Sequence, residues 1–435
     1  MTDARVELGY GQRRVEFRYD SNRFDVLESG AAAEPELDDD ALAARLDAPI
    51  GSAPLGDLVG ATDRVVVVVP DATRASGSDR VATALRNKLR TLGLPDAHLE
   101  VLIGGGTHRP PTPDEVRRIV GPEVLAALRI HPHDAFDERA NAHLGETPRG
   151  TPVELNRRLV EADRVILVGA IGFHYFAGFS GGRKALLPAC ASDRSIQANH
   201  LLGFDRERLW KAEGVATASL DGNPVSEDME DAARLFGPTF LVNTVLDGRG
   251  RIVGAYAGDW HAAHRAGCAD YLATHSVRAP ERRPVVIVSA GGAPRDLNMI
   301  QSHKALEHAR LLAEEGGDLV LLAECGDGLG RPDWLDWFAA GDAAAMAANL
   351  VRNYRIYGQT AWGVRWKTEV YRVRLVSALP PDHVRAMGMI PHASLEEAVA
   401  ACPGDRGWIL PQGLATLPRV GHTSTATAPT GVPAA

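Results

Sequence analysis

The chain has 435 residues, 45% hydrophobic and 24% charged, which is the balance of an ordinary globular protein long enough for about two or three domains. A formal net charge of −9 disfavours nucleic acid as the main partner, because phosphate backbones bind basic surfaces. No apolar run is long enough for a membrane helix, no signal segment opens the chain, and four scattered cysteines form no disulfide or zinc pattern, so we expect a cytoplasmic protein that does not bind membranes.

The first predicted elements are an alternating segment and a strand. Residues 5–28 alternate polar and apolar side chains and predict a hairpin or edge strands. Five consecutive valines in residues 63–70 predict a strand that is buried on both faces, and therefore parallel. Asp71, Thr73 and Arg74 follow directly at its end. Asp71 fits a helix cap, whereas Arg74 fits an arginine that binds a carboxylate or a phosphate through its two-pronged guanidinium.

A second strand, residues 98–103, runs into three consecutive glycines that are followed by Thr107 and His108. The glycines, including Gly105 and Gly106, allow backbone amides to approach a phosphate or another anion closely. The sequence TPDE a few residues later predicts a capped helix start, with threonine at the cap, proline in the first turn and glutamate three residues on.

A third apolar strand, RVILVGAI, runs into the densest cluster of chemically active residues in the chain. His174, Gly181, Gly182 and Lys184 lie within it. A phosphate-binding P-loop is excluded here, because that motif needs glycine directly before the lysine and serine or threonine directly after it. In this chain arginine precedes Lys184 and alanine follows it.

Ser192 is a capping residue for a helix predicted to continue to about residue 214, with His200 two turns into it. One histidine is an incomplete metal site, since most metal sites use three or four protein ligands. A metal at His200 would therefore take most of its ligands from another group. His261 and His264, on a later predicted helix, have no third ligand at metal-binding spacing and are expected to face solvent.

A second series of alternating strands and helices begins after the proline-rich, charged segment 277–284, which has the composition of a linker. Residues 284–324 predict a strand, a Gly-Gly loop, an amphipathic helix and a strand. Gln301 and Lys304 are three apart on that helix and share a face, either as solvated residues or as residues that face a cleft. Trp362 is a candidate for stacking on a flat ring, although most tryptophans pack in cores.

The runs DATR, GGGTHR and HYFAGFSGGRK, followed by LLPACAS and the Asn-His pair that ends at His200, resemble the nickel-dependent lactate racemase family. The resemblance implies a racemase or epimerase that inverts C2 of a 2-hydroxy acid, lactate or a related short-chain acid. It also implies a nickel pincer nucleotide, which is a pyridinium-3,5-bisthiocarboxylic acid mononucleotide bonded to nickel. Maturation enzymes that insert sulfur and nickel are implied as partners.

The same resemblance assigns roles to residues. His108 and His174 are the acid/base pair, Lys184 attaches the cofactor covalently, His200 is the nickel ligand, and Arg74 holds the substrate carboxylate. The remaining cofactor-binding candidates are Asp71, Gly105, Gly106, Thr107, Gly181, Gly182, Gln301, Lys304 and Trp362. Gln301 and Lys304 are also candidates for binding the substrate. Ile300 departs from the tyrosine expected beside Gln301, which leaves the identity of the acid open.

The chemistry of 2-hydroxy acids supports a cofactor. Their C2–H is weakly acidic beside a carboxylate, so proton abstraction is difficult, and protein side chains offer no hydride acceptor. Two histidines can act as acid or base near neutral pH. The alternatives are a nicotinamide-dependent α/β dehydrogenase, which the absence of a G-x-G-x-x-G strand motif disfavours, and a non-catalytic nucleotide-binding relative.

We predict an α/β fold with two α/β domains and a cofactor cleft between them, because strands alternate with helices and strand ends collect at one edge. The predicted extents are 1–278 for the N-terminal catalytic and cofactor-anchoring domain, to which 410–420 can return, 279–409 for the C-terminal domain that closes the cleft, and 421–435 for a disordered tail.

Overall fold

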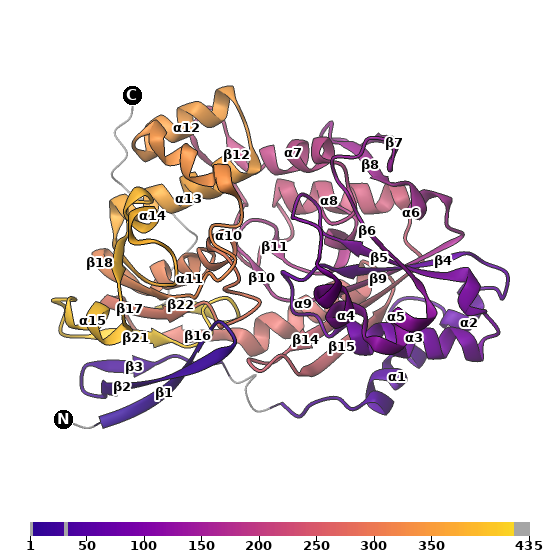
Figure 1. Ribbon diagram of the computed structural model, residues 1–435, viewed down its shortest axis with the longest axis horizontal. Helices are drawn as coiled ribbons and strands as arrows, with labels where there is room; N and C mark the ends of the chain where they lie inside the picture. Colours follow the sequence, from indigo (N-terminus) through magenta and orange to yellow (C-terminus); the bar gives the residue numbers. More distant parts are fainter. Residues whose placement is uncertain (1–2, 30–33, 422–435) are drawn as a thin grey trace.

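The computed structural model describes residues 3–29 and 34–421, and residues 422–435 of the predicted tail lie outside this range. Two six-stranded sheets form two α/β units that lie next to each other (Figure 1). Among the described helices, none is long and apolar enough to cross a membrane.

The first sheet has the strand order β15-β14-β9-β4-β5-β6, and all of its pairs are parallel except β14 with β15. Its strands are β4 (Val65–Pro70), β5 (Leu99–Gly104), β6 (Arg129–Pro132), β9 (Arg164–Ala170), β14 (Phe240–Leu246) and β15 (Ile252–Gly258). Alternate valines of β4 belong to two separate cores, one on each face, which confirms the prediction of a strand buried on both sides.

Helices cover both faces of this sheet. Their bounds are α1 (Asp39–Asp47), α2 (Leu55–Leu58), α3 (Ser78–Thr91), α4 (Pro113–Val120), α5 (Pro122–Ala127), α6 (Arg157–Glu161), α7 (Asp193–Leu201), α8 (Pro224–Phe236) and α9 (Ala262–His275). The sequence TPDE forms the predicted capping box, in which Thr112 and Glu115 bond each other's backbone amides. A small antiparallel pair, β7 (Asn141–Glu146) with β8 (Pro152–Asn156), lies beside this unit.

The second sheet has the order β20-β19-β18-β17-β21-β3, with every pair parallel. Its strands are β3 (Phe24–Val26), β17 (Arg283–Ser289), β18 (Ala313–Leu322), β19 (Arg372–Val376), β20 (Ile390–His392) and β21 (Gly407–Leu410). Its helices are α10 (Met299–Ser302), α11 (Ala305–Leu312), α12 (Ala343–Arg352), α13 (Ile356–Val370), α14 (Pro381–Ala386) and α15 (Leu395–Ala400).

The N-terminal strands differ from the predicted domain boundary. β1 (Asp3–Tyr10) and β2 (Arg13–Asp20) form the expected hairpin, but their apolar side chains share a core with β17 and β18, and β3 pairs with β21. In Figure 1 the indigo hairpin lies beside the yellow C-terminal strands. Alternation in a sequence predicts a half-buried strand, yet it carries no information about which sheet covers its apolar face.

Short segments join the two units. β22 (Leu417–Val420) pairs with β16 (Ser276–Ala279), so the first residues of the linker-like stretch form a strand. The helix that begins at Ser192 ends at Leu201, so its predicted continuation is wrong. A small hairpin follows instead, β12 (Phe204–Asp205) with β13 (Trp210–Lys211), and its aromatic rings pack on Trp362 and Trp366 of the second unit.

Candidate active site

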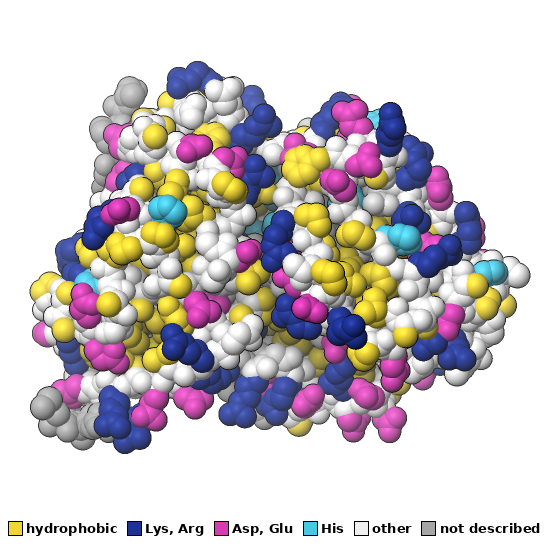
Figure 2. Space-filling model, in the orientation of Figure 1, with side chains coloured by type: hydrophobic (Ala, Val, Ile, Leu, Met, Phe, Trp, Pro, Cys, Tyr) yellow, Lys and Arg dark blue, Asp and Glu magenta, His cyan; other side chains and the backbone are white. Residues whose placement is uncertain are grey.

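A cavity of about 290 Å³ lies where the loops after β4, β5 and β9 meet α10, α11 and α13 of the second unit. On the face drawn in Figure 2, acidic and basic side chains are interspersed. The described cavity lining differs, because it carries four lysine or arginine side chains and one carboxylate. These charged lining residues are Asp71, Arg74, Lys184, Arg295 and Lys304. The cavity therefore favours an anionic ligand.

Parallel pairing brings the three strand-end loops together. Pro70 of β4 is paired with Gly104 of β5, so Asp71 and Gly105 come next to each other at the carboxyl edge of the sheet. β9 lies on the other side of β4 and runs into β10 (Phe173–His174) and β11 (Gly178–Phe179). This edge is where α/β sheets place ligands, as predicted for this chain.

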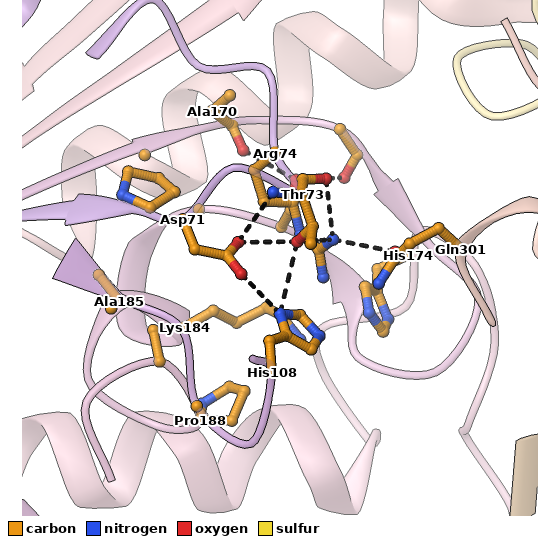
Figure 3. A pocket seen from close by; sticks show the side chains of 18 of the residues that line it. Asp71, Thr73, Arg74, His108, Ala170, His174, Lys184, Ala185, Pro188 and Gln301 are labelled. Carbon is orange, nitrogen blue, oxygen red and sulfur yellow. Dashed lines mark hydrogen bonds and ion pairs between the residues drawn. The ribbon is translucent and has the colours of Figure 1, made fainter. Parts of the chain in front are cut away.

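His108 is oriented by a carboxylate. Its Nδ1 lies 2.8 Å from Asp71 Oδ2, while the Thr73 hydroxyl donates to Asp71 Oδ1 at 2.7 Å (Figure 3). Burial alone would raise the pKa of Asp71, but the charge of His108 and its hydrogen bond hold that pKa below the ordinary value. Because an ionised carboxylate only accepts, Nδ1 carries the proton, and Nε2 of a neutral His108 is a free acceptor.

His174 is oriented by the backbone instead. Its Nδ1 accepts hydrogen bonds from the N–H groups of Ala177, at 3.1 Å, and Phe176, at 3.3 Å. The neutral ring therefore carries its proton on Nε2 and acts as a donor. Burial, and then the positive charges of Lys184 and Lys304, hold the pKa of His174 well below its usual value. The Tyr175 ring stacks on it with centroids 5.6 Å apart.

Lys184 lies in a 3₁₀ turn, Gly182–Ala185, that needs glycine at its start. Gly181 and Gly182 have φ of 76° and 56°, and a Cβ at Gly182 would lie 2.6 Å from the His264 ring. Burial, followed by the charges of Arg183 and Arg74, holds the pKa of Lys184 well below its usual value. The amine is therefore biased toward its neutral, nucleophilic form.

His200 has one ring nitrogen engaged. Its Nδ1 lies 3.0 Å from the carbonyl of Ile196, one turn earlier in α7, so Nδ1–H donates and Nε2 keeps its lone pair. The Phe176 ring stacks on the imidazole at 5.2 Å. Burial lowers the pKa of His200 to about 3, with a further contribution from Lys184. Across residues 3–29 and 34–421, no group of three His, Cys, Asp or Glu side chains forms a metal cluster.

The second unit contributes an amide and an amine. Arg74 Nη1 donates to Gln301 Oε1 at 2.9 Å (Figure 3). Lys304 Nζ donates to the same oxygen at 2.5 Å. Burial and the neighbouring charges of Arg74 and Lys184 hold the pKa of Lys304 well below its usual value. Gln301 lies in α10 and Lys304 caps α11, so the single predicted helix is two short ones that meet at the cavity.

Three expectations about side-chain placement need correction. Trp362 does not line the cavity, because it is buried in the core of the second unit against Phe204 and Trp210. Gly182 packs under His264 rather than facing the cavity, whereas Gly105, Gly106, Thr107 and Gly181 do line it. His264 is buried and hydrogen-bonded near Arg183 and Ser180, so it does not face solvent. Hydrophobic spacing does not show which face of a helix meets another element.

The sequence did not point to several lining residues, among them Tyr271, Arg295 and Tyr357. Tyr357 extends from α13 to the GGGTHR loop, where its hydroxyl lies 2.6 Å from Thr107 Oγ1 and donates to Thr107 O at 3.1 Å. Each of these residues lies far in sequence from the motifs, and an isolated tyrosine or arginine carries no spacing signal.

Comparison with known proteins supplies independent information. Residues 10–210 match the family described as lactate racemase N-terminal domain, and residues 279–407 match the lactate racemase C-terminal domain. The lactate racemase of Thermoanaerobacterium thermosaccharolyticum is 32% identical over 338 residues, 77% of this chain and 78% of that protein. The lactate racemase of Lactiplantibacillus plantarum is 33% identical over 432 residues, 95% of this chain and 99% of the relative.

Solved structures agree with these matches. The lactate racemase apoprotein from Thermoanaerobacterium thermosaccharolyticum superposes with a TM-score of 0.85 at 29% identity, covering 96% of this chain and 100% of that one. A Thermotoga maritima protein shares the fold, with a TM-score of 0.70 at 19% identity, covering 91% of this chain and 100% of that one.

Proposed function

The chain belongs to the lactate racemase family and is an isomerase, and from this premise we propose that it inverts C2 of lactate or a related short-chain 2-hydroxy acid with a nickel pincer nucleotide held on Lys184. The observation that carries the proposal is the convergence, on one cationic cavity, of two histidines in opposite tautomers with a buried lysine of lowered pKa. Sulfur- and nickel-inserting enzymes would be its partners.

The residues present fit such a cofactor. His200 offers one nitrogen lone pair, and no cluster of three His, Cys, Asp or Glu side chains forms around it among the described residues, so a metal there would need ligands from a bound group. Lys184 offers an amine biased toward the neutral form, which is the form that forms a covalent attachment. When bound, the nucleotide supplies a ring that accepts the C2 hydride and returns it, which no protein side chain can do.

Arg74 binds the substrate carboxylate in this proposal. Its guanidinium can present two parallel N–H groups to two oxygens, and one of them now contacts Gln301 Oε1. A carboxylate that takes the place of this amide oxygen would lie close to Lys304 as well, since Lys304 contacts the same oxygen. This position fixes the C1 end of the acid and leaves C2 and its hydroxyl to the histidines.

His108 takes the hydroxyl proton through Nε2, and Asp71 stabilises the imidazolium that results. His174 donates Nε2–H to the same oxygen, which polarises the carbonyl of the 2-oxo acid in the manner of a neutral electrophilic imidazole. For His174 to serve as the base for the mirror-image substrate, its ring must first release the backbone N–H groups of Phe176 and Ala177. Both histidines are thus acid/base candidates, and the hydrogen bonds support His108 as the one whose Nε2 is free to accept a proton.

The acid itself is set by the rest of the lining. Ile300 lines the cavity beside Gln301 and presents an apolar surface there. Its position supports a substrate panel that includes 2-hydroxy acids with longer or branched side chains.

The test uses protein purified from cells that make the nickel nucleotide. We expect an adduct of a few hundred daltons on Lys184 in peptide mass spectra, about one nickel per chain, and conversion of either pure enantiomer of an accepted acid to the racemate. Lys184→Arg keeps a long basic side chain but removes the primary amine, and it should carry no adduct. A fully loaded protein that interconverts no enantiomers across a broad panel of 2-hydroxy acids would sink the proposal.

A further inference from the structure

Arg295 is a cavity-lining arginine whose guanidinium has no partner among the described residues. It lies in the loop between β17 and α10, is partly buried and lines the cavity. Within residues 3–29 and 34–421 its guanidinium makes no hydrogen bond and no ion pair. A desolvated charge without a partner costs free energy, so its retention in a cavity points to a ligand that supplies the missing anion.

The charges around Arg295 do not neutralise it. The carboxylate whose charge acts on it is Asp247, and that group is already paired with Arg251 at 2.7 Å. Arg14 adds a repulsive positive charge from the hairpin of the second unit while it donates to the Gly248 carbonyl. Burial is the largest influence on Arg295 and holds its pKa below the ordinary value.

The chain makes room for this guanidinium. Gly291 has φ of 105°, and a Cβ there would lie 3.3 Å from Arg295 Cδ and 3.6 Å from Nη1. The arginine therefore folds back over a residue that has no side chain. Tyr271 lines the same end of the cavity, and its ring is fixed edge-on by Phe173 at 4.9 Å and by stacking on His275 at 3.7 Å. Its hydroxyl has no hydrogen-bond partner among the described residues, so it is a second free donor.

Arg295 reaches the cavity from another segment than the residues of the reacting end. Arg74, in the loop after β4, donates to Gln301 at 2.9 Å, whereas Arg295, in the loop after β17, folds over Gly291 and makes no hydrogen bond to Arg74 or Gln301. Arg295 and Tyr271 influence each other. The cavity thus offers two arginines at two places, and a ligand with one carboxylate uses only one of them.

We propose that Arg295 and Tyr271 form a second oxyanion subsite, which binds an anionic group at the far end of a ligand whose reacting carboxylate lies at Arg74. A planar guanidinium and a phenol hydroxyl are donors suited to carboxylate or phosphate oxygens. Two sources fit this chemistry: the distal carboxylate of a dicarboxylic 2-hydroxy acid, or the phosphate of the bound nucleotide. The assignment deepens the proposed function and rests on it for the identity of the ligand.

The first experiment does not depend on catalysis. Binding of inorganic phosphate, succinate and acetate to the full chain without cofactor is measured by calorimetry at low ionic strength. We expect Arg295→Met to weaken phosphate and succinate roughly tenfold or more, as for a lost charge-assisted contact, and to leave acetate nearly unchanged. Arg13→Met is the matched control, because Arg13 is exposed and lies outside the cavity lining. Arg295→Lys should recover part of the affinity, which separates a binding role from a folding defect.

The second experiment separates the two sources in cofactor-loaded protein. If the subsite holds the nucleotide phosphate, Arg295→Met and Tyr271→Phe lose nickel and nucleotide mass on dialysis while the wild type keeps them. If it holds a distal carboxylate, retention is unchanged and KM for malate rises relative to KM for lactate, with kcat little altered. Equal phosphate and succinate affinities in Arg295→Met and the wild type would overturn the subsite. Failure of the wild type to racemise any acid would overturn the proposed function and leave the binding result standing.

Discussion

The two histidines of the cavity show how differently one residue type is prepared by its surroundings. His108 follows a glycine loop and donates Nδ1–H to the carboxylate of Asp71. His174 ends the two-residue strand β10, and its Nδ1 accepts backbone N–H groups from the turn that follows. A side-chain acceptor leaves Nε2 free to take a proton, whereas a backbone donor leaves Nε2 with one to give.

The two hydrogen-bond arrangements make the two histidines differ in the free energy needed to protonate them. Protonating His174 would direct an Nδ1–H at two backbone N–H groups in a cavity that already carries Lys184 and Lys304. Protonating His108 would place a new charge beside an ionised carboxylate. The pair therefore works most readily as one base and one neutral donor, although the reaction it serves is symmetric in its two substrates.

Substituting glutamine at each histidine tests this asymmetry most strongly. At His174, glutamine can accept the backbone N–H groups with its oxygen and donate with its amide, so we expect a loss in kcat of roughly tenfold. At His108, glutamine keeps the bond to Asp71 but cannot take a proton, so we expect a loss of about 10²- to 10⁴-fold. Both variants must carry the wild-type amount of nickel nucleotide, measured by mass. Equal losses in kcat at the two positions would contradict the asymmetry and would mean that His174 acts as a base as effectively as His108 does.

Replacing Asp71 by asparagine should turn His108 into a copy of His174. The amide can donate to Nδ1 and so move the proton of His108 to Nε2, where it blocks base catalysis. We expect kcat to fall roughly 10- to 100-fold with little change in KM, since orienting residues act through the group they hold. Thr73→Val removes only the hydroxyl that supports Asp71 and should have a much smaller effect. A pH–rate profile identical to the wild-type profile in Asp71→Asn would contradict the role of this carboxylate.

The sequence predicted the strand ends well and the partners of the side chains poorly. Asp71, His108, His174 and Lys184 follow buried strands, and parallel pairing alone brings strand ends to one edge. The tautomer of His174 depends on a turn geometry that residue types do not specify. The placement of Trp362 and of the first strands depends on which apolar faces meet between distant segments, and periodicity in one segment carries no record of its partner.

The low pKa of His174 also predicts how stability changes with pH. Its folded pKa lies below the unfolded value of about 6.5, so between these two values the unfolded chain binds a proton that the folded chain does not. The free energy of unfolding should therefore fall as pH drops below about 6.5, with up to about 1.4 kcal/mol per pH unit from this residue. Urea unfolding of the cofactor-free chain at pH 5 to 8 measures it, and His174→Gln should make the dependence shallower. The difference in the free energy of unfolding between His174→Gln and the wild type at pH 8 provides the baseline. An unchanged slope of this free energy against pH would show that His174 binds its proton equally in the folded and the unfolded chain.

The smallest effect is expected at the contact that closes the His108 side of the cavity. Tyr357 bonds both the hydroxyl and the carbonyl of Thr107, the residue directly before His108, whereas no side chain of α13 forms a hydrogen bond with the described turn at His174. Tyr357→Phe keeps the ring and removes these bonds, so we expect a loss of about 1 kcal/mol, seen as a several-fold rise in KM with kcat changed less. Trp362→Phe, in the core of the same helix, is the matched control and should alter thermal stability more than KM. If Tyr357→Phe lowers kcat as severely as His108→Gln does, the prediction of a small effect is wrong. The loop that carries His108 would then depend on the second unit for its geometry, in addition to the hydrogen bond from His108 to Asp71.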